Sequence, residues 1–256
     1  METVRRALQL LKCIAEKPLR MMEVAELMGI NKSSASRMLN TLHQEGFVEL
    51  NSSRKYEIGS TIYLLSKSAS ESNRIRRLAS PHLTQLAEDT GETIHLAALD
   101  GNNVIYIDKI DSNKAVRLNS RIGTSNPIHC TGVAKVLLAY SPSRTSERII
   151  SKVSFDKYTD NTIANEKQFR KELDKVRKSG VAYVFEEHFE SVNCIAAPVF
   201  DNRGVAAGIS ISSTTVCTDR ETLIGYRDQL IETANQISLS LGYRGKMPVH
   251  EKLHNF

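Results

Sequence analysis

Residues 20–58 constrain the fold more than any other part of the chain, because two runs with helical apolar spacing follow each other closely. Apolar residues recur at i, i+3, i+4 and i+7 in both runs, as Met21, Val24, Ala25 and Met28 and then as Ala35, Met38, Leu39 and Leu42. Gly29 stands where the first helix should end, and Asn31 is suited to cap the second. The sequence therefore predicts a helix, a tight turn and a second helix.

The second predicted helix has a polar side without an acidic residue. At about 100° per residue, the side chains opposite or beside the apolar stripe are Ser33, Ser34, Ser36, Arg37, Asn40, Thr41 and Gln44, with Lys32 at the helix start. Hydroxyls and helix N-terminal amides bind phosphate, arginine binds guanine, and asparagine or glutamine binds adenine. These residue types suit a DNA duplex; an ordinary helical hairpin with a solvated polar face is the alternative.

A predicted hairpin follows the second helix. FVEL at 47–50 and KYEIG at 55–59 are typical of short strands, with the turn NSSR between them and Arg54 and Lys55 near its tip. Two helices and such a hairpin describe a winged helix-turn-helix, so we expect this part to bind double-stranded DNA. The candidate DNA-binding residues are Lys32, Ser33, Ser34, Ser36, Arg37, Asn40, Thr41, Arg54 and Lys55.

The charge distribution fits this expectation. The 256 residues carry a formal net charge of +5. Residues 1–77 contain 13 lysines and arginines against 8 acidic residues, whereas residues 78–256 contain 21 of each. A basic first part suits a polyanionic partner, although an excess of this size also arises by chance.

Hydropathy and cysteine usage bound the cellular setting. No apolar run is long enough to span a bilayer, and the N-terminus lacks an apolar secretory segment. The four cysteines are scattered without a CxxC pair: Cys13, Cys130, Cys194 and Cys217. We therefore expect a cytoplasmic protein with reduced thiols, no membrane association and no metal site.

The chain divides by pattern into three regions. We expect a winged helix-turn-helix domain at residues 1–60, a linker helix region at 61–77 and a larger domain at 78–256. The first helix, at 2–16, should present one apolar face made of Val4, Ala7, Leu8, Leu11 and Ile14. Another helix, RIRRLASPHLTQLAEDT, should be broken or kinked near Pro81 and closed at Gly91.

The larger region mixes strands and helices. Strands are expected at 93–100 and 104–110 around a hairpin turn, then at 115–120, 181–187, 194–200 and 206–212. Helices are expected at 131–140, at 141–153 with Ser141 as its cap, at 165–179, and as one long helix from about 219 to 241. Hairpin-joined strands with inserted helices predict an α+β domain rather than a doubly wound parallel sheet.

The larger region shows no catalytic constellation. It has no dinucleotide or phosphate-loop fingerprint, His129 and Cys130 diverge as neighbours, and no base accompanies Cys194. A zinc site from His95, Cys130 and Cys194 would lack ligand spacing. We therefore expect no catalytic residue and no cofactor.

Polar residues that interrupt apolar elements indicate a ligand pocket instead. His95 lies inside a predicted strand, Ser210 and Ser212 share one face of another, and Thr131 and Gly132 open a helix whose free amides can bind an anion. A pocket for a small carboxylate-bearing molecule is one interpretation. Satisfied polar residues on a solvent-facing sheet are the other.

Ordered motifs over nearly the whole chain resemble the IclR family of bacterial transcriptional regulators. They are VRRALQLL, ELMGINKSSASRMLNTLHQEGFVE, KYEIG, ETIHLAALDGNNVIYIDKIDS, RIGTSNPIHCTGVAKVLLAY and CIAAPVFDNRGVAAGISIS. SRIG and IHLAALD look most like the subgroup that includes KdgR, the 2-keto-3-deoxygluconate regulator. The resemblance implies a winged helix-turn-helix, a linker helix and a GAF-like effector domain, in dimers that often pair into tetramers.

The resemblance also implies where an effector binds. The family pocket is lined by the segment matching Asn126 to Ala134 and by strands matching those of Cys194, Ser210 and Ser212. The candidate effector-binding residues are His95, Asn126, His129, Cys130, Thr131, Gly132, Ala134, Glu187, Cys194, Ser210 and Ser212. Three positions depart from the family pattern: Ala134 stands where glycine is common, and Val184 and Ser191 replace an aspartate and a glycine of KdgR-like proteins.

These observations together predict a DNA-binding regulator, and a repressor in particular, of a catabolic operon. A sugar-derived keto or hydroxy acid is the expected effector, and a pseudo-palindromic operator the expected DNA. Two alternatives stay open: an enzyme that acts on a small acid through its second domain, and a DNA-binding protein with a non-functional sensor domain.

Overall fold

The computed structural model describes residues 2–65 and 74–245. The chain forms two compact units, residues 1–73 and 74–256, which are described separately. The predicted boundaries at 60 and 77 differ from this division, and part of the predicted linker lies outside the described residues. Within the described ranges, no helix combines the length and the apolarity needed to cross a membrane.

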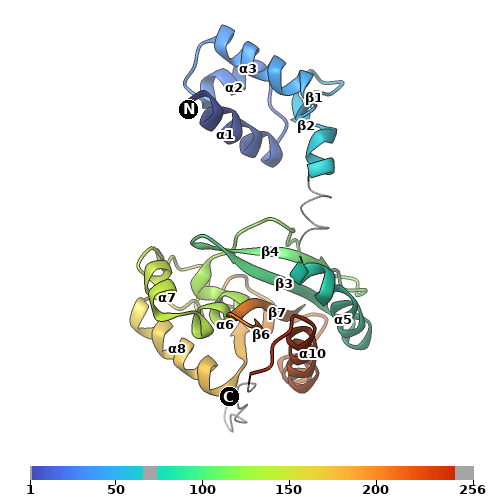
Figure 1. Ribbon diagram of the computed structural model, residues 1–256, viewed down its shortest axis with the longest axis vertical. Coiled ribbons are helices and arrows are strands. Elements are labelled where there is room, and N and C mark those ends of the chain that lie inside the picture. The colour runs from blue at the N-terminus through green and yellow to red at the C-terminus, as the bar shows by residue number, and fades with distance from the viewer. Residues whose placement is uncertain (1, 66–73, 246–256) are drawn as a thin grey trace. The chain divides into compact units, whose positions relative to one another are not determined.

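The first unit is three helices and a hairpin. Its elements are α1 (Glu2–Glu16), α2 (Met21–Leu27), α3 (Lys32–Gln44), β1 (Val48–Leu50) and β2 (Tyr56–Ile58) (Figure 1). The turn forms as predicted: Gly29 has φ +59°, and the Asn31 side chain accepts from the Ser34 amide at 2.8 Å. The antiparallel hairpin pairs Val48 with Ile58, which completes a winged helix-turn-helix. Residues 60–65 are helical.

The apolar face predicted for α1 is partly wrong. Leu10 and Ile14 are buried in the core of the unit, whereas Val4 and Leu8 are 64% and 56% exposed. Leu8, Leu10 and Leu11 together cover more of the helix circumference than one core contact can bury. Periodicity alone therefore does not select the buried side; packing against α2, α3 and Leu19 does.

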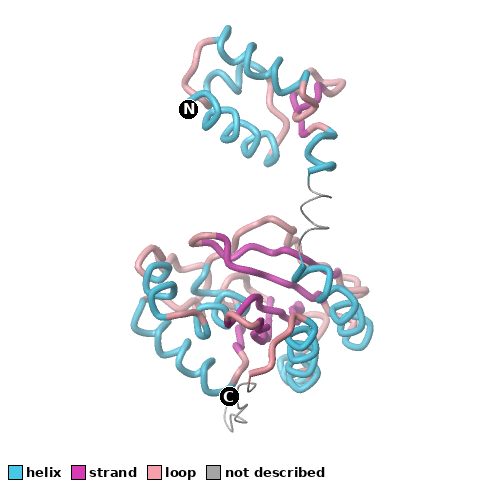
Figure 2. The backbone as a smooth tube through the Cα atoms, viewed as in Figure 1, coloured by secondary structure: helices cyan, strands magenta, loops and turns pink. Residues whose placement is uncertain are grey.

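The second unit is a five-stranded antiparallel sheet between two helical layers (Figure 2). The strands are β3 (Thr93–Asp100), β4 (Asn103–Ile110), β5 (Ala182–Phe185), β6 (Val192–Asp201) and β7 (Gly204–Thr214), in the order β4-β3-β7-β6-β5. Helices α5 (Arg74–Thr90), α9 (Arg220–Gly225) and α10 (Arg227–Ser240) cover one face. The other carries α6 (Gly132–Tyr140), α7 (Ser143–Ile150) and α8 (Glu166–Ser179). This antiparallel sheet confirms the α+β prediction.

Strand alternation explains the two layers. Ile195 of β6 belongs to the core beneath α5 and α10, and its neighbour Ala196 belongs to the core beneath α6 and α8. The small side chain of Ala196 lets α6 lie close to the sheet: a Cβ on Gly132 would lie 3.0 Å from the Ala196 Cβ. Apart from Lys135, the sequence of α6 is apolar all round, as expected for a helix that is buried on all sides.

Four local predictions for this unit need correction. Residues 115–120 are not a strand, because the chain leaves the sheet after Ile110 and forms a loop that reaches 127 before a 3₁₀ turn, η1 (Ile128–Cys130). Ser141 ends α6, with its hydroxyl bonded to the Leu137 carbonyl, and does not cap α7. Helix α5 runs unbroken through Pro81. The closing helix is split at Tyr226, directly after Gly225, into α9 and α10.

Candidate functional site

Helix α3 presents a polar, acid-free face to solvent. Ala35 and Leu39 are buried against α2, which turns Arg37 and Asn40 outward. Lys32, Ser33, Thr41 and Gln44 are also exposed, and Ser34 and Ser36 are half-buried. The polar face predicted for α3 is therefore accessible to solvent, and Lys32 lies at the start of the helix.

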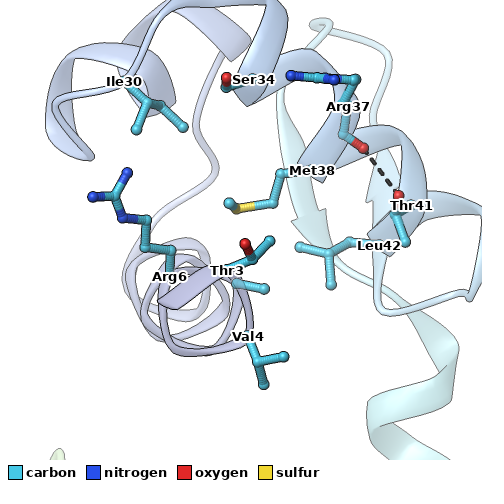
Figure 3. Close-up of a pocket in the computed structure, with 10 residues that line it drawn as sticks. Thr3, Val4, Arg6, Ile30, Ser34, Arg37, Met38, Thr41 and Leu42 are labelled. Atoms are coloured by element: carbon cyan, nitrogen blue, oxygen red, sulfur yellow. Dashed lines mark hydrogen bonds between the residues drawn. The ribbon is translucent and has the colours of Figure 1, made fainter. Parts of the chain in front are cut away.

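A groove of about 680 Å³ runs between α1 and α3 (Figure 3). Met38 and Leu42 lie in it, and Ser34, Arg37 and Thr41 line its α3 side. The Thr41 hydroxyl donates to the Arg37 carbonyl at 3.1 Å, as a helical threonine commonly does. Arg6 of α1 lines the same groove, so the structure adds to this surface a cation that the sequence analysis did not select.

The wing tip is a tight turn closed by an asparagine. Asn51 Oδ1 accepts from the amides of Ser53 and Lys55 at 3.1 and 3.0 Å, and Arg54 is exposed at φ +55°. A non-glycine residue in this left-handed region costs about 1–2 kcal/mol relative to ordinary backbone. The hairpin thus accepts strain to place a cation at its tip.

The second unit contains a cavity of about 600 Å³. Its walls come from β3, β4, β5, β6, β7, the start of α6 and two loops, 111–127 and 186–191. Eight of the predicted effector-binding residues line it: His95, Asn126, Cys130, Thr131, Gly132, Cys194, Ser210 and Ser212. The sequence-based grouping of His95, Ser210 and Ser212 corresponds to one contiguous surface, because β3 and β7 are paired with His95 opposite Ser210.

His95 connects the strands that form the cavity floor, β3 and β7, to the loop 111–127 that forms its wall. The imidazole Nε2 lies 2.7 Å from Ser120 Oγ, and Nδ1 lies 3.4 Å from the hydroxyls of Ser210 and Ser212. The ring stacks on Tyr106 at 4.4 Å between centroids. Burial, aided by the Lys109 charge, lowers the pKa of His95 to about 3, so the imidazole is neutral at physiological pH.

The start of α6 lies at the cavity, where the Gly132 amide hydrogen-bonds the Cys194 thiol. Thr131 precedes the helix, but its hydroxyl donates to the Pro127 carbonyl at 3.1 Å and does not cap the helix. The first turn contains no acidic residue, and Gly132 and Val133 both line the cavity. The helix dipole, with no acidic residue or side-chain cap at this end, favours an anion here.

The cavity thiols are not activated. Burial raises the pKa of Cys130 to about 12 and raises that of Cys194 as well, although hydrogen bonds from Ser212 and Ser210 oppose the second shift. A thiol needs a lowered pKa to act as a nucleophile. No group of histidine, cysteine or carboxylate side chains suited to a metal ion occurs in residues 2–65 and 74–245.

Three predicted residues lie outside the cavity lining. His129 Nε2 hydrogen-bonds the Asp156 carbonyl at 2.9 Å, and Ala134 is fully buried on the core side of α6. Glu187 accepts from Lys135 Nζ at 2.5 Å; burial raises the pKa of Glu187, and the lysine opposes that shift. These side chains serve packing and a buried ion pair.

Other lining residues were missed. They are Tyr106, Arg117, Leu118, Asn119, Ser120, Arg121, Thr124, Val133, Val184, His188, Phe189, Val192 and Thr214. Thr214 continues the alternation of Ser210 and Ser212, so the sequence did carry a signal for it. Residues 117–120 carried none because their pattern favoured a strand, and the later loop residues lie outside any pattern that marks a pocket.

Both units of the chain match models of known protein families. Residues 3–52 match the family model described as the IclR helix-turn-helix domain, and residues 67–239 match the bacterial transcriptional regulator IclR C-terminal model. The chain belongs to the IclR family. It is thus a DNA-binding transcriptional regulator with an N-terminal helix-turn-helix domain and a C-terminal antiparallel-sheet domain.

Individual relatives agree with this assignment. KdgR of Dickeya chrysanthemi is 36% identical over 230 residues, 89% of this chain and 75% of that protein. XynR of Escherichia coli K12 is 32% identical over 246 residues, 94% of this chain and 98% of that protein. Because these relatives are transcriptional regulators, the IclR-family chain is not an enzyme.

Solved structures show the same fold. IclR of Thermotoga maritima has 32% identity and a TM-score of 0.78 over 95% of this chain and 100% of that chain. An IclR homologue of Microbacterium hydrocarbonoxydans complexed with 4-hydroxybenzoate has a TM-score of 0.81 over 94% of this chain and 99% of its own. Its identity is 20%, so this likeness concerns the fold alone.

Proposed function

We propose that this IclR-family regulator is a repressor that leaves its operator when a small keto or hydroxy acid binds the cavity of the second unit. One observation carries the proposal: the α6 N-terminus opens into a cavity whose described lining contains two arginines and no aspartate or glutamate. Helix amides, Arg117 and Arg121 all favour a carboxylate.

Other residues of the cavity lining suit hydroxyl or keto groups. Ser210 and Ser212 lie beside the neutral His95 imidazole, and Ser120 and Thr124 of the loop line the same cavity. Hydroxyls act as donors and acceptors, so they fit a polyol or keto acid in several orientations. The Microbacterium relative with its bound 4-hydroxybenzoate supports an acid as the ligand of this fold.

For the first unit, we propose that Lys32, Ser33, Ser34, Ser36, Arg37, Asn40, Thr41, Arg54 and Lys55 contact a pseudo-palindromic operator in the cytoplasm. Such a site needs two modules. Exposed apolar side chains on this unit support self-association into dimers and dimers of dimers: Val4, Leu8, Tyr63, Leu64 and Leu65.

A thermal-shift panel tests the effector class. It contains 2-keto-3-deoxygluconate and gluconate, with glucose as the match without a carboxylate and 4-hydroxybenzoate as an aromatic acid. At about 100 times its Kd, a ligand stabilises the protein by about 2.7 kcal/mol. We expect a sugar acid to raise the Tm and to release a bound duplex. A response to glucose alone would refute a carboxylate effector, and a response to 4-hydroxybenzoate alone would refute a sugar-derived one.

Ser212→Ala should abolish the sugar-acid shift and leave DNA binding intact. Ser213→Ala is the matched control, because Ser213 is the next residue of β7, is also buried and points to the other face of the sheet. Gly132→Val is unsuitable for this purpose. A Cβ there would lie 3.0 Å from both Cys194 Sγ and Ala196 Cβ, so the variant would disturb packing as well as binding.

A further inference from the structure

Two neighbouring residues of β4 hold different parts of the second unit. Lys109 lies opposite His95 in the β3–β4 pairing, and Asp108 lies opposite Leu96. Successive strand residues point to opposite faces. Lys109 therefore shares the cavity face with His95, whereas Asp108 shares with Leu96 the face covered by α5.

Lys109 holds the cavity wall in place. Its Nζ donates to the carbonyls of Leu118 and Ser120 at 2.8 and 2.9 Å, and pairs with Asp111 at 2.7 Å. Leu118 and Ser120 both line the cavity. Since Ser120 Oγ also bonds His95, the wall and the floor of the cavity meet at this residue.

Asp108 holds the first turn of α5. One carboxylate oxygen, Oδ1, lies 3.2 Å from Arg76 Nε and accepts from the Lys109 backbone amide at 3.0 Å. The Asp108 side chain is only 10% exposed. Arg76 is close to the start of α5, and residues 66–73 connect α5 in sequence to the helix-turn-helix unit.

We propose that the Arg76–Asp108 ion pair couples occupancy of the cavity to the DNA-binding unit. The contacts are contiguous and run through Ser212, His95, Ser120, Lys109, Asp108 and Arg76. An acid that engages Ser212 or Ser120 changes the carbonyl contacts of Lys109, and Asp108 transmits the change to the root of the linker. This proposal rests on the proposed effector cavity; coupling requires that the acid contact the two states differently.

A hydrogen-exchange cycle tests the coupling without any ligand. Lys109→Met releases the wall, and the amides of residues 78–80 report on the first closed turn of α5. We expect several-fold faster exchange in residues 111–127 and also in 78–80. In an Arg76→Gln background, Lys109→Met should speed only the loop, whereas in an Arg77→Gln background it should still speed both segments. Arg77 is the exposed neighbour of Arg76 and serves as the matched control.

Two results would overturn the coupling. In the first, Lys109→Met speeds amide exchange in residues 111–127 but not in 78–80. In the second, exchange in 111–127 does not change, which would mean that Lys109 does not hold this loop. If Lys109→Met does not fold, Ser120→Ala replaces it, because it removes only the hydroxyl that bonds His95.

A DNA-release experiment tests the coupling separately from the chemical class of the effector. The ligand is any acid of the panel that shifts the wild type, and the DNA is a duplex selected by the wild-type protein from a random pool. Effectors commonly change affinity by roughly 5- to 150-fold. In Arg76→Gln and Asp108→Asn the acid should still raise the Tm but no longer release the duplex, whereas Arg76→Lys should retain release. If the acid still releases the duplex from both Arg76→Gln and Asp108→Asn, the coupling is refuted. If no acid of the panel raises the Tm of the wild type, the effector class is refuted instead. The hydrogen-exchange cycle, which needs no ligand, then decides the coupling.

Discussion

At the scale of single residues, Arg37 and Lys32 lie on one helix but should contribute differently to DNA binding. Arg37 is exposed on the outer face of α3 and should read a base, whereas Lys32 at the helix start should contact phosphate. We expect Arg37→Ala to cost about 1–3 kcal/mol on the selected duplex and to relax its specificity. Lys32→Ala should weaken binding to every duplex and reduce the salt slope by about one.

Fluorescence anisotropy at several salt concentrations, on matched and altered duplexes, measures both effects. Lys171→Ala, which removes an exposed cation of α8, is the control for net charge alone. Wild-type affinity in Arg37→Ala would mean that α3 does not enter the groove as proposed.

His95 should make stability depend on pH. Its pKa falls from 6.5 to about 3 on folding, chiefly through burial. Between these values the unfolded chain binds the proton and the folded one does not, so the stabilising contribution is complete above pH 6.5 and is lost as the pH falls toward 3. We expect the free energy of unfolding of the second unit to decrease by up to about 1.4 kcal/mol per pH unit in this window. Urea unfolding at pH 4 to 7 should show a smaller slope in His95→Gln; an equal slope would place the titration elsewhere.

At the scale of elements, the wing carries a cation, Arg54, at a backbone position that is strained for any residue other than glycine. Arg54→Gly removes the left-handed strain at φ +55° and also removes the cation. Because glycine has a more flexible unfolded chain, the net gain in unfolding free energy should be at most about 1 kcal/mol, while DNA affinity should fall. Arg54→Lys should do the opposite, keeping affinity without a stability gain. Parallel unfolding and DNA titrations check this, and a loss of stability in Arg54→Gly would contradict it.

For the whole molecule, assembly should precede tight DNA binding. Sedimentation should show dimers or larger species at micromolar concentration, and half-sites should be centred about one helical turn, or a multiple of it, apart. Val4→Glu together with Leu8→Glu should weaken the dimer if α1 forms its interface, because both side chains are exposed and apolar. A monomer that binds a single half-site at full affinity would refute this.

Local sequence signals determined most of the first unit and the β3–β4 hairpin of the second. Gly29 and Asn31 act within their own turn, and the Asp100–Asn103 hairpin is closed by neighbours in sequence, so the printed residues suffice to place them. The alternation of Ser210 and Ser212 likewise predicted that both hydroxyls share one face of a strand, because a strand repeats every two residues; the structure shows that this face lines the cavity.

Tertiary structure alone decided the cavity wall and the buried side of α1. Residues 115–120 carry a strand-like pattern, yet the carbonyls of Leu118 and Ser120 find their donor in Lys109 Nζ, a side chain from another element, and not in a neighbouring strand. Glu187 pairs with Lys135, which is distant in sequence, and is therefore not part of the cavity lining. Where a backbone or charged group is satisfied by a distant partner, local pattern contains no record of the choice, because the partner becomes available only when the chain has folded.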